Sequence, residues 1–495
     1  MSFPDPRPGD RRIGVVDVGS NSVRMVVFEG GRRCPATIYN EKVLCGLGAD
    51  LAVTGRLSPT GCDRALAALR RFLALAPGLK LSALAGVATA AVREAEDGAA
   101  FRDRVARDTN IRLRVATGED EARLAAQGVL FGDPSATGLV VDLGGASMEL
   151  CPVNSAGPGR GVTTPLGPQR LGPLDDPDAV RAVVRKELEP LAQRFAGSAH
   201  RLYLVGGAWR ALGRVLLEHA AHPLPILHEY AFPPGQADAV IEALLGMDKD
   251  GLGQISTVSS ARRGTLPHAA LLLEQLIAIF GPERIQISGF GLREGVCFDI
   301  LTADLRAEDP LLSTAAGQER TRARMPGFGA DLAEWAMTAM PPLDEREERL
   351  MRAACYLSDV SWRAHPDFRG TACREVVTRI NLSSAGHRGR AYLLAALLTR
   401  YKGSRKALET EPAIALLDED SLLRARQMGG LMRLGATISA GMPGYLRLTP
   451  LTLADGILTL APTTEGESFM GEEVEKRLDR AARLLDARPV IEPVV

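Results

Sequence analysis

The sequence predicts an α/β protein of two similar lobes, followed by a mostly helical C-terminal region. The first observation is a repeated pattern: an apolar strand that ends in Asp, a turn rich in Gly and Ser, and a second strand. The pattern occurs at Asp17 and again at Asp142, 125 residues further along the chain. Such repetition is typical of a duplicated domain. The second observation is the pattern of residues 331–435, which is mostly helical.

The elements of the first lobe follow in order along the chain. Residues 13–16 and 23–28 are apolar and β-branched and predict strands, with a turn at 17–22 between them. Leu66, Leu69 and Leu73 share one helical face, so residues 61–76 predict a helix that stops at Pro77-Gly78. A strand near 81–87, a turn at 89–93 and a helix to about 105 follow. Residues 111–115 predict a strand that leads into a helix at Gly118.

The second lobe repeats this order. Residues 138–141 predict a strand that ends at Asp142, and residues 148–153 predict its partner. Strands at 202–205 and 285–288 each run into a glycine-containing turn. Residues 303–330 are rich in Ala, Asp, Arg, Gly and Pro, which predicts a linker. A hairpin with arms at 445–449 and 456–460, and a charged helix at 472–485, end the chain.

We therefore divide the chain into four parts. Residues 1–127 form lobe I, 128–302 lobe II, and 303–330 a linker. Residues 331–495 form a helical domain with a small β-hairpin and a helix at its end.

Composition excludes several classes of protein. Lys plus Arg is 59 and Asp plus Glu is 60, a net charge of -1, which argues against a protein that coats nucleic acid. No run approaches ~18 apolar residues. The N-terminal segment lacks the apolar core of a secretory signal, so we expect a cytoplasmic protein without a membrane span. The seven Cys form no CxxC pair, which predicts reduced thiols and no zinc site.

The two repeated turns have the composition of phosphate-binding loops. Backbone N–H groups in Gly/Ser turns commonly hold phosphate oxygens. Gly19, Gly144 and Gly145 let the backbone approach a ligand. Neither turn has the spacing of a Walker A motif or of a Rossmann fingerprint. The alternative is two tight hairpin turns, but the repetition with Asp at the same place favours a functional role.

Acidic residues lie beside these turns. Asp17 and Asp142 end apolar strands, and Glu149 follows closely. Facing each other across a cleft, such carboxylates can hold a hydrated Mg²⁺ together with phosphate oxygens. Alternatively, each one caps a turn. Residues 118–123, Gly-Glu-Asp-Glu-Ala-Arg, open a helix, where the helix dipole favours acids. The functional interpretation makes Glu121 a general base that deprotonates a water.

Six motifs, in this order and spacing, resemble the exopolyphosphatase / guanosine pentaphosphate phosphohydrolase family. They are Asp17-Val-Gly-Ser-Asn-Ser22, Thr89-Ala-Ala-Val-Arg93, Gly118-Glu-Asp-Glu-Ala-Arg123, Asp142-Leu-Gly-Gly-Ala-Ser-Met-Glu149, Val205-Gly-Gly207 and Leu292-Arg-Glu-Gly295. The resemblance covers residues 11–300 strongly and the remainder weakly. It implies two ribonuclease-H-like lobes of the actin-like ATPase fold around a cleft. It also implies an α-helical HD-like C-terminal domain and Mg²⁺-dependent hydrolysis of a terminal phosphoanhydride.

The resemblance implies a role for each matching residue. Glu121 matches the catalytic glutamate. Asp142 and Glu149 match the carboxylates around the metal, and Asp17 is a further candidate metal ligand. The phosphate-binding residues are Ser20, Asn21 and Ser22 in the first loop, Gly144, Gly145 and Ser147 in the second, and Arg93. Arg24, just past the first loop, is a weaker candidate.

The second loop departs from the family pattern Gly-Gly-Gly-Ser-Thr-Glu. Ala146 adds a Cβ at a place where a positive φ is a candidate backbone conformation. Met148 replaces a hydroxyl with an apolar thioether. We expect this loop to bind phosphate differently or less tightly.

The C-terminal half departs further. Ser358-Asp359 stands where true HD phosphohydrolases have a metal-binding His-Asp dyad, and His365, Asp367 and His387 have the wrong spacing for one ligand set. We interpret this domain as non-catalytic, serving dimerisation and guidance of substrate. Its candidate cationic surface consists of Arg363, Arg369, Arg388, Arg390, Arg400, Lys402, Arg405 and Lys406. The alternative is ordinary solvated helix faces.

These observations predict an exopolyphosphatase that removes the terminal phosphate of inorganic polyphosphate, with Mg²⁺ as cofactor. Two alternatives stay open. One is the same chemistry on guanosine pentaphosphate (pppGpp), and the other is a non-hydrolytic sensor that binds polyphosphate or a guanosine alarmone. The expected partners are the substrate and a second copy of the chain, with no nucleic acid and no membrane.

Overall fold

The computed structural model describes residues 12–29, 33–403 and 405–493. They fall into two compact units: unit 1 runs to Ala307, except for residues 223–225, and unit 2 contains those three residues and the chain from Glu308 onward. The N-terminal segment for which no secretory signal is expected lies outside the described residues. Within the described ranges, no helix is long and apolar enough to cross a membrane.

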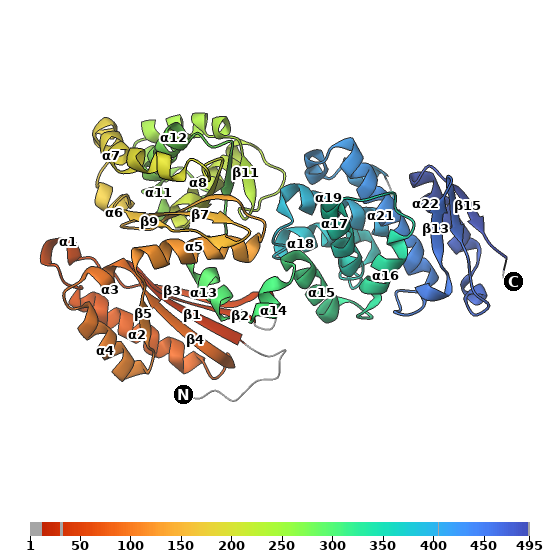
Figure 1. Cartoon of the computed structure of the whole chain (residues 1–495), viewed down its shortest axis with the longest axis horizontal. Helices are drawn as coiled ribbons and strands as arrows, with labels where there is room; N and C mark the ends of the chain where they lie inside the picture. The colour runs from red at the N-terminus through yellow and green to blue at the C-terminus, as the bar shows by residue number, and fades with distance from the viewer. Residues whose placement is uncertain (1–11, 30–32, 404, 494–495) are drawn as a thin grey trace. The chain divides into compact units, whose positions relative to one another are not determined.

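The first half of unit 1, lobe I, is built on a five-stranded sheet in the order β3-β2-β1-β4-β5 (Figure 1). Its strands are β1 (Arg12–Val18), β2 (Ser22–Glu29), β3 (Thr37–Leu44), β4 (Leu81–Ala88) and β5 (Leu113–Val115). The strands β1, β2 and β3 are antiparallel neighbours, whereas β4 and β5 run parallel to β1. The helices are α1 (Leu51–Thr54), α2 (Pro59–Leu75), α3 (Ala90–Glu94) and α4 (Gly98–Thr109). Leu66, Leu69 and Phe72 bury the apolar face of α2 in the core of this lobe.

Lobe II is built on a seven-stranded sheet in the order β11-β12-β10-β6-β7-β8, with β9 also paired to β7. Its strands are β6 (Gly138–Leu143), β7 (Met148–Asn154), β8 (Gly157–Pro158), β9 (Val162–Thr164), β10 (Arg201–Val205), β11 (Tyr230–Phe232) and β12 (Arg284–Ile287). Its helices are α6 (Pro168–Leu171), α7 (Pro177–Phe195), α8 (Gly207–His219), α9 (Asp238–Gly246), α10 (Lys249–Gly253), α11 (Ser260–Arg263) and α12 (Leu266–Phe280). Trp209 and the leucines of α12 lie in the buried core of this lobe.

The two lobes repeat one another around their first hairpins. In lobe I, β1 pairs with β2 antiparallel and with β4 parallel; in lobe II, β6 pairs in the same way with β7 and β10. The turns share a hydrogen bond at the same position, from the Gly19 N–H to the Ser22 carbonyl and from the Gly144 N–H to the Ser147 carbonyl, both 3.0 Å. The sequence repeat is therefore a structural repeat.

Two helices lie between the sheets: α5 (Gly118–Gly132) and α13 (Leu292–Ile300). One face of α5, with Leu124 and Phe131, packs on lobe I. The opposite face, with Ala125 and Val129, packs on the strands of lobe II. The lobe boundary expected at 127/128 therefore falls inside a helix that belongs to both cores, which a sequence pattern alone does not reveal.

The segment 303–330, expected as a linker, is largely helical. It contains α14 (Ala303–Ala307), which belongs to unit 1, and α15 (Pro310–Arg322), which belongs to unit 2. The Asp309 side chain accepts a hydrogen bond from the Leu312 N–H, and Pro310 occupies the first helical position. Asp309 and Pro310 therefore begin a helix inside the segment that composition predicted as a linker.

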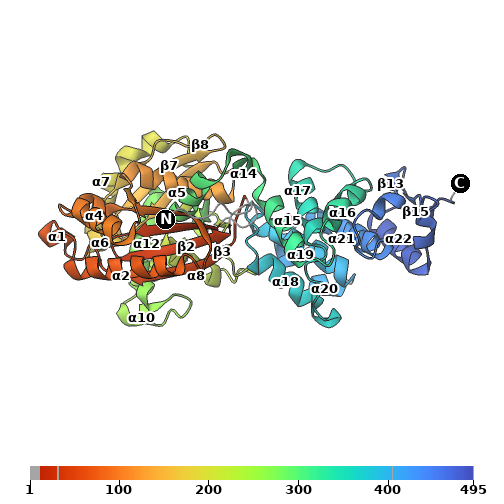
Figure 2. The same cartoon turned by 90° about the horizontal axis from the view of Figure 1, so that it is seen from below.

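Unit 2 continues with α16 (Phe328–Met337), α17 (Glu345–Leu357), α18 (Arg369–Arg379), α19 (Gly386–Tyr401), α20 (Arg405–Glu409), α21 (Glu419–Ile438) and α22 (Glu472–Leu484). A small sheet, β13-β14-β15, lies beside α22 (Figure 2). The strands are β13 (Leu451–Ala454), β14 (Ile457–Leu460) and β15 (Arg488–Ile491). The hairpin arm expected at 445–449 was misplaced: Ala454 pairs with Ile457 across a two-residue turn, so the arm must immediately precede that turn.

Candidate active site

The repeated turns face a single cleft of unit 1 with a volume of about 370 Å³. Its walls include every predicted site residue except Arg93: Asp17, Ser20, Asn21, Ser22, Glu121, Asp142, Gly144, Gly145, Ser147 and Glu149. Arg93 reaches the same place indirectly, because it binds Glu121. The structure thus brings together residues that are separated by up to 132 positions in the chain, from 17 to 149.

The acidic cluster at the start of α5 divides into structural and cleft-facing residues. Thr117 and Asp120 form a reciprocal capping box, and Glu119 is an exposed partner of Arg160. Helix capping and the helix dipole account for both acids. Glu121 differs, because its side chain is only 11% exposed and lines the cleft.

Arg93, at the end of α3, holds Glu121. Its Nη1 donates hydrogen bonds to Glu121 Oε1 and, at 2.8 Å, to the carbonyl of Ala116. Burial raises the pKa of Glu121 to about 7, although Arg93 lowers it and the charges of Asp17 and Glu94 raise it. A carboxylate with a pKa near the working pH is suited to general-base catalysis.

Asp142 and Glu149 lie directly opposite each other on β6 and β7. Burial, and then the charge of Glu121, raise the pKa of Asp142 to about 7 and that of Glu149 well above its usual range. Glu149 Oε1 is buried and accepts no hydrogen bond from the part of the chain that the structure describes. Such carboxylate oxygens fit a hard divalent cation, which would offset their mutual repulsion. Among the described residues, no group of three or more Asp, Glu, His or Cys side chains forms a metal cage. Mg²⁺ suits such a site because it retains water and substrate oxygens as ligands.

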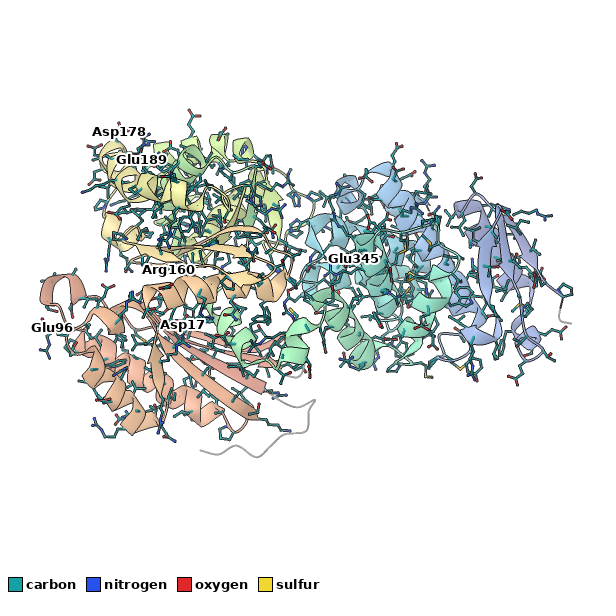
Figure 3. The ribbon with its side chains drawn as sticks, in the orientation of Figure 1. Asp17, Glu96, Arg160, Asp178, Glu189 and Glu345 are labelled. Atoms are coloured by element: carbon teal, nitrogen blue, oxygen red, sulfur yellow. The ribbon has the colours of Figure 1, made fainter. Side chains whose placement is uncertain are left out.

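Asp17 has a different local role from Asp142. Its Oδ2 accepts a hydrogen bond from Arg293 Nη1 at 3.2 Å, and Arg293 is the second residue of α13. The residue facing Asp17 on β2 is Arg24, whereas the residue facing Asp142 on β7 is an acid. Asp17, which we predicted as a metal ligand and which is labelled in Figure 3, therefore forms an ion pair with Arg293 and faces Arg24 across the hairpin.

The cleft also contains cations that the sequence did not single out. They are Lys42 on β3, Arg210 on α8, Arg262 on α11 and Arg293 on α13, and they join Arg24, the weaker candidate. Burial and the neighbouring arginines lower the pKa of Arg24 to about 10 and also lower those of Lys42 and Arg210. Like charges held this close are favourable when an anion lies between them. Among Lys42, Arg210, Arg262 and Arg293, only Arg293 belongs to one of the six sequence motifs.

The two departures in the second loop, Ala146 and Met148, do not strain its backbone. Ala146 is not among the residues with positive φ, so its Cβ causes no backbone strain. Met148 is fully buried in the core of lobe II and does not line the cleft. Gly206, with φ 117°, packs against the start of this loop, where a Cβ would lie 2.5 Å from the Leu143 carbonyl oxygen.

In unit 2, Asp359 occupies the place of the metal-binding dyad. It is buried, and its carboxylate accepts hydrogen bonds from the Arg324 guanidinium, including one of 2.7 Å from Nη2. His365 pairs instead with Asp367, its neighbour in sequence.

Comparison with known proteins then decides the family. Residues 26–304 match the model described as the Ppx/GppA phosphatase family, and residues 311–490 match the model described as "Exopolyphosphatase, C-terminal". The chain belongs to the Ppx/GppA phosphatase family. Its membership confirms the predicted class of enzyme, a phosphoanhydride hydrolase.

Individual relatives agree with the family assignment. Exopolyphosphatase 1 of Mycobacterium tuberculosis is 27% identical over 301 residues, which cover 58% of this chain and 87% of the relative. Retrograde regulation protein 2 of Saccharomyces cerevisiae is 25% identical over 439 residues, which cover 79% of this chain and 73% of the relative.

Solved structures give the fold. An exopolyphosphatase from Cytophaga hutchinsonii has a TM-score of 0.54 at 24% identity and covers 59% of this chain and 97% of its own. The Aquifex aeolicus member of the Ppx/GppA family has a TM-score of 0.52 at 22% identity, covering 58% and 96%. The predicted fold class, actin-like lobes followed by a helical domain, is confirmed.

Proposed function

We propose that this member of the Ppx/GppA family is a Mg²⁺-dependent exopolyphosphatase that removes the terminal phosphate of inorganic polyphosphate. The observation that carries the proposal is the cleft itself, in which two phosphate-type turns and Glu121 share a wall with five cationic side chains. A chain of phosphates carries negative charge along its length and matches such a cationic wall. The relatives named exopolyphosphatase support the same substrate.

In this proposal the terminal phosphate lies between the two turns. Backbone N–H groups of both loops, with the hydroxyls of Ser20, Ser22 and Ser147, hold its oxygens. Glu121 orients a water for in-line attack and accepts its proton, and Arg93 keeps the carboxylate in place. The remaining phosphates extend along the cationic side chains. Positioning and electrostatics supply most of the acceleration in such phosphoryl transfers.

Asp142 and Glu149 would hold the Mg²⁺, which supplies neutralisation of charge on the phosphate oxygens. Both lie beside the second loop, and the buried, unpartnered Oε1 of Glu149 supports this assignment. Asp17 orients Arg293 instead of serving as a primary ligand.

Hydrolysis of pppGpp by the same groups remains the alternative activity, because its terminal phosphoanhydride presents the same atoms to the cleft. Phosphate release from polyphosphate and from pppGpp, each measured with and without Mg²⁺, separates the two. A higher kcat/KM on polyphosphate supports the proposal, and a higher value on pppGpp overturns its substrate.

The variant Glu121→Gln tests the catalytic base. The amide is almost isosteric with the carboxylate but accepts no proton, so we expect kcat to fall about 10²–10⁴-fold with substrate binding retained. Glu119→Gln, an exposed acid two residues earlier on the same helix, is the matched control. A kcat for Glu121→Gln within a few-fold of the Glu119→Gln value would mean that Glu121 is not the base.

A further inference from the structure

A row of alternating charges connects the candidate base, Glu121, with lobe II. Glu121 binds Arg93, whose Nη2 lies 3.6 Å from Glu94 Oε1. The other oxygen of Glu94 accepts a hydrogen bond of 2.5 Å from Arg170 Nη2. Glu94 ends α3 in lobe I, whereas Arg170 lies in α6 of lobe II. The Glu94–Arg170 pair therefore spans the two lobes.

Arg170 is attached to the second phosphate loop through its neighbours. The Gln169 N–H donates a 2.9 Å hydrogen bond to the Gly145 carbonyl. Gly167 packs so closely on the loop that a Cβ there would lie 2.3 Å from the carbonyl carbon of Ala146. A movement of the second loop relative to lobe I must therefore carry Arg170 with it and change its distance from Glu94.

The Glu94 carboxylate lies within ion-pair distance of two cations, Arg93 and Arg170. Both Glu94 and Arg170 line a mostly apolar cavity of about 920 Å³, and among the described residues that line it they alone are charged. Since Arg93 also holds Glu121, the partner that Glu94 takes affects how firmly Arg93 stays beside the base.

We propose that Glu94 and Arg170 are positioning residues that couple closure of the lobes over the phosphate to the placement of Arg93 beside Glu121. With the lobes closed, Arg170 holds Glu94 and leaves Arg93 to Glu121. With the pair broken, Glu94 takes Arg93 as its partner and draws it away from the base. This inference rests on the proposed roles of Glu121 and Arg93.

The pair is too exposed to act mainly by stabilising the fold. The side chains of Arg170 and Glu94 are 43% and 37% exposed, and such pairs contribute little to folding stability. Its effect is therefore expected in turnover rather than in the melting temperature.

The test uses the full-length protein and four variants: Arg170→Gln, Arg170→Lys, Glu94→Gln and the double variant Glu94→Gln/Arg170→Gln. Arg160→Gln is the matched control, because Arg160, labelled in Figure 3, is also an arginine of lobe II that pairs with an acid of another element. Its side chain is 81% exposed and is not among the residues that line the cleft. Phosphate release from polyphosphate is measured for kcat and KM separately.

We expect Arg170→Gln to lower kcat about three- to tenfold with KM within about twofold, and Arg160→Gln to change neither. Arg170→Lys should restore kcat to within about twofold of wild type, since it keeps the charge. The double variant should turn over faster than Arg170→Gln, because the carboxylate that competes for Arg93 is gone. A merely structural pair would not show this rescue.

Two outcomes overturn the inference: an Arg170→Gln kcat equal to that of Arg160→Gln, or a double variant slowed by the product of its two single effects. If the wild type releases no phosphate from polyphosphate, the proposed function fails, and amide hydrogen exchange on residues 90–94 and 167–171 decides the inference instead. Addition of polyphosphate should protect both segments in the wild type and less so in Arg170→Gln. Equal exchange in the two proteins would then overturn it.

Discussion

The chemistry of the site depends on a few charges held away from water. Burial is the leading cause of the raised pKa of Glu121, Asp142 and Glu149. The charge of Glu121 also raises the pKa of Asp142 and of Glu149, and the charge of Asp142 raises that of Glu149. Arg93 is the neighbour that lowers the pKa of Glu121 most. The raised pKa of Glu121 should therefore affect the pH dependence of activity, and that of Asp142 the pH dependence of stability.

Arg93→Ala should shift the pH dependence of activity as well as weaken it. The base acts when deprotonated, so activity falls as the pH drops through the pKa of Glu121, which is about 7. Removing Arg93 takes away the charge that lowers this pKa, so the acidic limb of the kcat/KM profile should move to higher pH. Arg93→Lys, which keeps the charge, should move it less. An acidic limb that stays in place in Arg93→Ala would show that Arg93 does not set the protonation of the base.

Asp142→Asn should stabilise the protein, and more so at high pH. The folded pKa of Asp142 is about 7, above the unfolded value of about 3.9. A raised pKa means that its contribution to stability is fully present below about pH 4 and is lost as the pH rises through about 7. In the absence of divalent cations, the gain in melting temperature over wild type should be larger at pH 8 than at pH 5. The exposed Asp63→Asn is the control. A gain that does not depend on pH would contradict the buried, charged state of Asp142.

At the scale of elements, the crossing of α5 and α13 places the base relative to both loops. The helices approach so closely that a Cβ on Gly295 would lie 2.0 Å from the Leu124 carbonyl oxygen, and one on Gly128 would lie 2.1 Å from the Gly291 carbonyl oxygen. Glu121 and Arg293 lie on these two helices, so their positions in the cleft depend on this contact.

Gly295→Ala should therefore destabilise unit 1 by about 3 kcal/mol, the upper end of the usual cost of overpacking, because backbone rather than a flexible side chain must move. It should also lower kcat, since the shift reaches Glu121. Urea unfolding and phosphate release measure the two effects. Gly197→Ala, where a Cβ meets nothing within 4 Å, is the control. Equal stability of the two variants would mean that the helices separate at little cost.

At the scale of the whole molecule, the predicted site lies within unit 1, which ends at Ala307. Unit 1 therefore includes α14, which lies beyond the lobe boundary expected at residue 302. Arg33 Nε donates a 3.0 Å hydrogen bond to the Arg306 carbonyl and so holds α14 to this unit. The helical unit offers a weaker cationic surface than its composition suggested. Arg388 and Arg405 pair with Asp418 and Glu409, and Arg390 is buried.

The fragment 1–307 should fold and hydrolyse short polyphosphate but release long chains early. Extra contacts along a long chain would come from the helical unit and add avidity without altering the chemical step. Product length on a gel after a single encounter measures processivity. The fragment 1–302 is the comparison, and it should be less stable because it lacks α14. If 1–307 runs long chains down to the shortest products without releasing intermediates, unit 2 has another role.

The local features of this protein were predictable from its sequence. The alternation of apolar strand, Gly/Ser turn and apolar strand predicted both hairpins, and their repetition predicted the two lobes. Ten of the eleven predicted site residues line one cleft. The eleventh, Arg93, was predicted as a phosphate-binding residue, and the structure places it beside Glu121. These predictions succeeded because turn chemistry and strand pattern are set by neighbours in the chain.

Which charged side chains contact one another was not predictable from the sequence, because it depends on how distant segments pack. Lys42, Arg210 and Arg262 come from different elements, and no local pattern distinguishes them from the many other arginines and lysines of the chain. Asp17 and Asp142 occupy equivalent positions in the repeat, yet one faces arginines and the other faces Glu149. The motif assigned Met148 to the phosphate loop, but its side chain lies in the core. Met148 begins a strand, and side chains alternate between the two faces of a strand. The strength of an electrostatic interaction depends on distance and burial, and both are set by packing between segments far apart in sequence.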